Sequence, residues 1–124
     1  MSQKTLYRRN FKELKIWQKG FDIAIKAFKL TDGIPGEERY GMISQINRAA
    51  VSIPSNIAEG SSRTSEKDYQ RFIEISLGSS FELETQLLIA QTVGFGNAAI
   101  NLQMLKDIDE EQKMLLAFMK KLNH

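Results

Sequence analysis

Residues 48–60 read RAAVSIPSNIAEG and combine a helical apolar pattern with an internal proline. From Ile43 to Ile57, apolar residues recur at alternating steps of three and four, the spacing of a helix that packs on another helix. Pro54 removes one backbone donor and crowds the preceding turn. Because the apolar steps continue past it, we predict a kinked helix over about 37–59 rather than a helix end.

The side of this helix away from the isoleucines is lined by Arg48, Ser52, Ser55 and Glu59, with Asn56 beside them. Short, specific polar groups such as these serines are less usual on a solvent-exposed face than lysine and glutamate. They indicate contact with another helix or another subunit. Alternatively, Ser52 and Ser55 satisfy backbone groups that Pro54 leaves without a partner. The sequence leaves both interpretations open.

Three further segments follow the helical period, over residues 11–30, about 66–92 and about 98–122. Turn residues separate them, and Ser65 is a suitable N-cap for the second of the three. Sustained alternation of apolar and polar residues is missing, so strands are not expected. Four long helices with short connections predict an all-α fold, an antiparallel up-down-up-down four-helix bundle. We expect residues 1–124 to form one domain, with residues 1–10 as a basic N-terminal arm.

The first helix has apolar residues on two nearly opposite sides. One line is rich in aromatic residues and includes Phe21 and Phe28, whereas the other contains Ile16, Ile23 and Leu30. We assign the aromatic line to the core and expect a neighbouring subunit to cover the other line. The predicted core consists of Trp17, Phe21, Phe28, Ile46, Ile53, Phe72, Leu83, Leu87, Leu105 and Leu115.

Composition argues against most enzyme chemistry. The chain of 124 residues has no cysteine, and its one histidine is the terminal His124. A thiol nucleophile and a histidine base next to a serine are therefore absent. We expect no enzymatic activity, no cofactor and no metal site, since Glu59 and Glu84 alone flank the core without histidine. No apolar run approaches the ~18 residues of a membrane helix, and residues 1–10 lack the apolar region of a secretory signal, so a cytoplasmic location is expected.

Basic residues concentrate at the beginning of the chain. Residues 1–30 hold eight lysines and arginines against two acidic residues, a net charge of +6, whereas the remainder carries −4. The expected nucleic-acid-binding residues are Arg8, Arg9, Lys12, Lys15, Lys19 and Lys26, of which the four lysines share one helical stripe. Such a stripe favours salt-sensitive contacts with a phosphate backbone. The same pattern is also typical of an ordinary solvent-exposed helix face.

The stretch at residues 48–60 resembles the hallmark of the 23S rRNA intervening-sequence proteins, also called the S23 or four-helix-bundle protein family. Similar matches are LKIWQKG at residues 14–20, IPGEERYGMISQINRAA at 34–50 and GSSFELETQLLIA at 78–90. They occur in the family's order and cover most of the chain. The N-terminal arm and the last helix resemble the family only in their pattern.

The resemblance implies a bacterial protein without enzymatic activity, often encoded within insertions in large-subunit rRNA genes. The family is similar to the accessory variability protein of diversity-generating retroelements, a pentameric ring that binds nucleic acid and a reverse transcriptase. A homo-oligomer, expected to be a pentamer, is therefore implied. Two hypotheses follow. The first is a non-enzymatic oligomer that binds structured RNA or DNA through a basic surface, and the second is an oligomeric scaffold for a protein partner.

Overall fold

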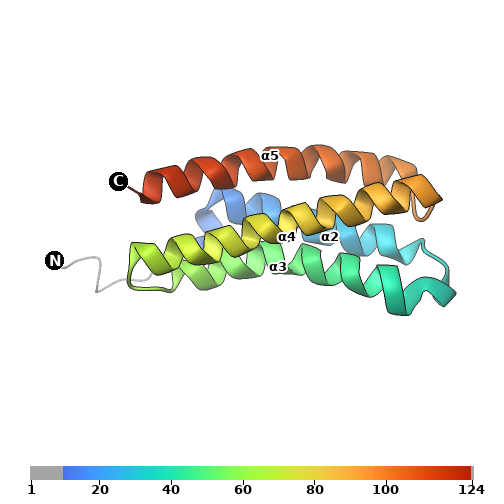
Figure 1. The fold of residues 1–124 in the computed structure, drawn as a ribbon, viewed down its shortest axis with the longest axis horizontal. Helices are drawn as coiled ribbons and strands as arrows, with labels where there is room; N and C mark the ends of the chain where they lie inside the picture. The colour runs from blue at the N-terminus through green and yellow to red at the C-terminus, as the bar shows by residue number, and fades with distance from the viewer. Residues whose placement is uncertain (1–9, 124) are drawn as a thin grey trace.

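The computed structural model describes residues 10–123, apart from the side chains of residues 38–40. Its four long helices are α2 (Lys15–Asp32), α3 (Ser44–Ser61), α4 (Glu66–Val93) and α5 (Ala98–Leu122). Each helix packs against the next, α2 also packs against α5, and the chain reverses direction at each connection (Figure 1). The predicted all-α four-helix bundle is confirmed, and no strand occurs over residues 10–123.

The connection between α2 and α3 differs from the prediction. A 3₁₀ turn at Gly36–Glu38 and a π-helical turn at Arg39–Ile43 precede α3, so the regular helix begins at Ser44 rather than near residue 37. Gly36 and Gly41 lower the helical propensity of this stretch, which accounts for the later start. Beyond it, α3 continues through Pro54 to Ser61, as the apolar spacing predicts.

The ends of α4 and α5 follow local capping chemistry. The Ser65 side chain accepts a hydrogen bond from the backbone nitrogen of Asp68 at 3.1 Å and begins α4. Gly94 ends α4 in the left-handed conformation, at φ 82°, which a glycine adopts without steric cost. Asn97 caps α5 by accepting from the Ile100 nitrogen at 3.0 Å. These signals place both helices within a residue of their expected bounds.

The core uses the opposite side of α2 from the predicted one. Phe21 and Phe28 are 48% and 51% exposed, whereas Ile23 and Leu30 are fully buried. The expectation that a neighbouring subunit covers the aliphatic line is therefore wrong, because the bundle itself covers it. Small residues on this side, Gly20 among them, let α2 approach its neighbours closely, and the bulky aromatic rings remain outside.

The other predicted core positions divide into two groups. Those that are fully buried are Ile46, Ile53, Leu83, Leu87 and Leu115. Those that are only partly buried are Trp17, Phe72 and Leu105, which flank the core. None of the helices in the described part of the chain is long and apolar enough to cross a membrane. The predicted N-terminal arm lies almost wholly outside the described residues, which include only its last member, Asn10.

Candidate nucleic-acid interface

The predicted lysine stripe begins with two exposed side chains. Lys12 lies in a short 3₁₀ turn, Phe11–Glu13, and Lys15 is the first residue of α2. Both are exposed, and neither forms an ion pair with any residue between 10 and 123. The Lys12 ammonium lies 5.9 Å from the centre of the Phe11 ring. These two charges are therefore available to an anionic partner. Arg8 and Arg9 lie outside the described residues.

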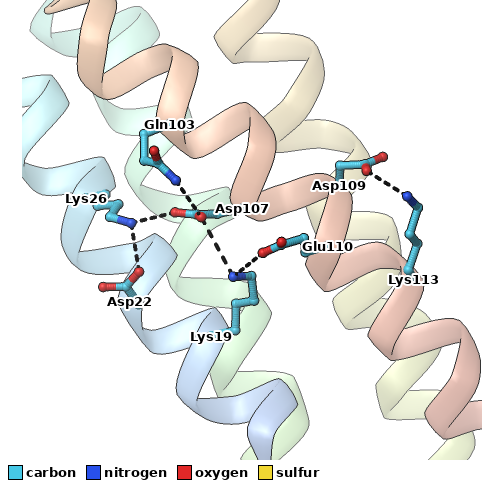
Figure 2. A network of polar contacts seen from close by, with 8 residues as sticks. All are labelled: Lys19, Asp22, Lys26, Gln103, Asp107, Asp109, Glu110 and Lys113. Carbon is cyan, nitrogen blue, oxygen red and sulfur yellow. Dashed lines mark hydrogen bonds and ion pairs between the residues drawn. The ribbon is translucent and has the colours of Figure 1, made fainter.

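The other two lysines of the stripe are engaged by acidic groups on α5. The Lys26 ammonium lies 2.6 Å from Asp107 and 2.9 Å from Asp22. The Lys19 ammonium lies 2.6 Å from Glu110 and 3.7 Å from the second oxygen of Asp107. Figure 2 shows both lysines reaching from α2 toward the Asp107 carboxylate on α5. The sequence stripe is thus split into a free part and a paired part.

Asp107 is the centre of this cluster. Its side chain is 6% exposed, and Gln103 donates a further hydrogen bond to it at 3.0 Å. Burial alone would raise the pKa of Asp107, but the bonds from Lys26 and Gln103 and the charge of Lys19 outweigh burial and lower the pKa. Hydrogen bonds to Glu110 and Asp107 likewise raise the pKa values of Lys19 and Lys26. Asp107, Lys19 and Lys26 are therefore charged near neutral pH.

The polar side of α3 contacts α4. The Ser52 and Ser79 hydroxyl oxygens lie 2.7 Å apart. Asn56 donates to both the carbonyl and the hydroxyl oxygen of Ser52, at 2.8 Å each. The Arg48 guanidinium lies 3.8 Å from Glu82. Of the two interpretations that the sequence left open, contact with another helix holds for Ser52 and Arg48, because both reach α4.

The remaining two members of this polar group face outward. Ser55 is exposed, and Glu59 forms an ion pair with Arg63 at 2.7 Å, one turn later on the same segment. Neither Ser52 nor Ser55 donates to a backbone group that Pro54 leaves free. Ser76 on α4 donates to the carbonyl oxygen of Ile53, the residue before Pro54, at 2.9 Å. The polar side of α3 is therefore mainly a helix-to-helix contact.

One acidic residue is buried although the sequence analysis did not predict it. Glu111 on α5 is 0% exposed, and neither of its carboxyl oxygens has a hydrogen-bond partner among the described residues. Burial raises the pKa of Glu111 to about 8, against the opposing charge of Lys19. Buried residues on α5 recur at Met104, Ile108, Glu111 and Leu115, in steps of four, three and four. This register is the sequence signal for its burial.

Metal chemistry has no visible site in this part of the molecule. Within residues 10–123, no group of three or more histidine, cysteine or acidic side chains could hold a metal ion. Asp22, Asp107 and Glu110 are paired with Lys19 and Lys26.

Comparison with known proteins places the chain in a family. The family model described as 23S rRNA-intervening sequence protein matches residues 12–117. The chain belongs to the 23S rRNA-intervening sequence protein family. The match extends from the first exposed lysine of the stripe through most of α5, and it therefore includes the α3 motif and the Asp107 cluster. The resemblance of residues 48–60 to this family is confirmed.

A solved structure shows the same fold. It is a protein of unknown function from the S23 ribosomal protein family of Bacteroides thetaiotaomicron VPI-5482, determined at 1.70 Å resolution. The TM-score between the two structures is 0.78 at 23% sequence identity, and the alignment covers 85% of the present chain and 98% of the Bacteroides chain. This similarity establishes the bundle and nothing about activity. No curated protein matches the chain.

Proposed function

We propose that this protein is a non-enzymatic, cytoplasmic bacterial scaffold that acts as a closed homo-oligomer and binds a macromolecular partner. The observation that carries the proposal is the outer row of α2, defined as Trp17, Phe21, Ile25 and Phe28. Phe21, Ile25 and Phe28 are each more than two-fifths exposed, and the Trp17 and Phe21 rings lie 5.1 Å apart. A row of exposed aromatic and aliphatic side chains of this kind on a small bundle is typical of a protein interface.

A second set of exposed apolar side chains supports a ring rather than a twofold dimer. The outer row of α4, defined as Ile75, Ile89 and Val93, lies along one side of that helix, with Glu82 and Gln86 on the same side between the two isoleucines, and all three apolar side chains are exposed. Both α2 and α4 pack against α3 and α5, so they occupy diagonal corners of the bundle. Two different patches on different sides of a subunit suit head-to-tail contacts, which generate cyclic oligomers when the rotation closes. We propose a pentamer, in keeping with the family resemblance.

Native mass spectrometry of the purified chain tests this assembly directly. The expected result is a complex of five 14.1 kDa chains. A different closed ring would correct the subunit number, whereas a monomer at micromolar concentration would contradict the proposed function.

A second candidate function is nucleic-acid binding, and the free lysines favour it. Lys12 and Lys15 are exposed and unpaired in the described part of the chain, and the family's name refers to an rRNA intervening sequence. In a ring, this small patch would be repeated once per subunit, and simultaneous contacts would strengthen weak binding. We rank it second because Lys19 and Lys26 are already paired with carboxylates on α5.

Binding of structured RNA and duplex DNA to the purified protein at ~50 mM and ~200 mM salt distinguishes the two functions. A phosphate-backbone interaction weakens steeply over this range. Steep salt dependence would support the nucleic-acid function. Absence of binding at ~50 mM salt, with an intact oligomer, would leave the protein-partner scaffold as the function.

A further inference from the structure

Glu111 occupies a tightly packed layer between three helices. If Gly20 on α2 carried a methyl group, that group would lie 3.1 Å from a Glu111 carboxyl oxygen and 3.4 Å from the backbone nitrogen of Pro54 on α3. It would also lie 3.1 Å from the Ile53 side chain. The glycine therefore makes room for the carboxyl group of α5 at a point where α2 also lies against the proline of α3.

The same place in α3 contains a backbone carbonyl without its regular donor. In an α-helix, the carbonyl of each residue accepts from the N–H four positions later. Pro54 has no N–H, so the carbonyl of Ala50 loses that bond. Ala50 is fully buried, so its carbonyl has no access to bulk water. A buried carbonyl that lacks its regular helical donor thus lies one turn before Pro54, and a buried carboxyl group without a partner lies beside the Gly20 position that faces Pro54.

We propose that Glu111 is a pH-sensitive latch: its neutral carboxyl group donates a hydrogen bond to the Ala50 carbonyl, and its ionisation loosens α5 from α2 and α3. A carboxylate accepts hydrogen bonds but cannot donate one. Only the protonated carboxyl group can therefore donate a hydrogen bond to the Ala50 carbonyl, which lacks its regular donor. An ionised carboxylate in this layer would be buried without a hydrogen-bond donor, which is strongly unfavourable.

The charged surroundings are consistent with a neutral group. Lys19 on α2 is the cation that acts on Glu111, but its own ammonium is bound to Glu110 at 2.6 Å. Next to the carboxyl group, α3 presents the uncharged Ile53 and Pro54. On α4, Glu84 is hydrogen-bonded to Gln112 at 2.9 Å, and on α5 Asp107 is held by both lysines and Gln103. Each neighbouring charge is therefore already partnered.

The first test follows the carboxyl group in the wild-type protein. Carbon-13 NMR of uniformly labelled protein resolves side-chain carboxyl signals, and the Glu111 signal is identified by its loss in Glu111→Gln. The latch requires a neutral signal at pH 6 that titrates only on the alkaline side of pH 7. A signal that titrates near 4.5, the ordinary value for glutamate, would overturn the proposal.

The second test measures the pH dependence of thermal unfolding. Between pH 5 and pH 8, the unfolded chain releases the Glu111 proton whereas the folded chain keeps it, so the unfolding midpoint of wild type should fall as the pH rises. Glu111→Gln, which keeps a neutral donor, should remove this slope. The control Asp109→Asn changes an exposed carboxylate of the same helix, which pairs with Lys113 rather than with Lys19, and it should keep the slope. Parallel profiles for wild type and Glu111→Gln would refute the latch.

The third test asks whether the bond depends on Pro54. Glu111→Gln can donate to the carbonyl of Ala50, whereas Glu111→Met has a similar size and cannot. The Gln variant should therefore have the higher unfolding midpoint. In a Pro54→Ala background, the helix supplies its own donor, and the difference between the two variants should shrink at least twofold. An equal difference in both backgrounds would refute the hydrogen bond to Ala50.

Discussion

The ammonium group of Lys26 on α2 lies 2.6 Å from a carboxylate oxygen of Asp107 on α5. The partners differ in environment, because the Asp107 side chain is 6% exposed and that of Lys26 is 27% exposed. Lys26 retains Asp22 and water if the pair is broken, whereas Asp107 does not have comparable access to solvent. The cost of breaking the pair therefore depends on which partner is removed.

Lys26→Met should destabilise the bundle by about 1–3 kcal/mol, because it leaves a buried carboxylate with a weaker set of partners. Asp107→Asn should cost less, since the two lysines keep Glu110 and Asp22. Urea unfolding of both variants measures the difference. As a control, Lys113→Met breaks an exposed pair with Asp109 and should change stability by no more than about 0.5 kcal/mol. A larger loss for Asp107→Asn than for Lys26→Met would contradict this asymmetry.

The Asp107 cluster should also give the bundle an acid-sensitive component of stability. Because the pKa of Asp107 is lowered in the folded state, its contribution is present above the ordinary value of 3.8 and is lost as the pH falls through the folded value. The free-energy difference between wild type and Asp107→Asn should therefore decrease below pH 4. A difference that stays constant from pH 6 to pH 2 would show that Asp107 is not ionised in the folded protein.

Two helical glycines should respond in opposite directions to alanine. At Gly60 in α3, a methyl group would lie 2.8 Å from the Phe72 Cβ and 3.1 Å from the Tyr69 ring, so Gly60→Ala should destabilise by about 1–3 kcal/mol. At Gly78 in α4, nothing lies within 4 Å, so Gly78→Ala should stabilise by roughly 0.5–1 kcal/mol. Calorimetric unfolding checks both. Equal effects at the two positions would refute the close approach of α3 and α4 at Gly60.

The helices could be predicted from the sequence because their caps and apolar spacing are local. Ser65, Gly94 and Asn97 each act within one turn of chain, and the structure bears out all three ends. The buried side of α2 could not be predicted in this way, because both of its apolar lines follow the helical period. Size decided between them: the small Gly20, not the large Phe21, allows close packing.

The ion pairs around Asp107 could not be predicted from the sequence for a different reason. Lys19 and Lys26 share a stripe by local geometry, but their partners Asp107 and Glu110 are more than eighty residues away. The net positive charge of the first thirty residues therefore includes Lys19 and Lys26, whose charges are neutralised by acidic residues of α5. Glu111 was missed because glutamate is rarely a core residue, although its position in the register of buried residues on α5 marks it as one.

If nucleic acid binds this protein, the free part of the lysine stripe should carry the interaction. The double variant Lys12→Glu/Lys15→Glu should weaken RNA binding by roughly tenfold or more at ~50 mM salt, because it replaces attraction to phosphates with repulsion. Fluorescence anisotropy with a labelled structured RNA measures the change. The control Lys106→Glu/Lys113→Glu makes the same charge change on α5 and should have a much smaller effect. Equal losses for the two variants would indicate nonspecific charge attraction instead.

The central claim is that the outer row of α2 is an assembly surface, and sedimentation velocity of three proteins at micromolar concentration tests it most directly. Wild type should sediment as a single oligomer. Phe21→Ser/Phe28→Ser should sediment as a folded monomer of about 14 kDa with unchanged helical content, because it removes two exposed rings and no core residue. Val51→Ser, at an exposed position of α3 outside both outer rows, should remain oligomeric. A monomeric wild type, or an unchanged oligomer in the double variant, would contradict the claim.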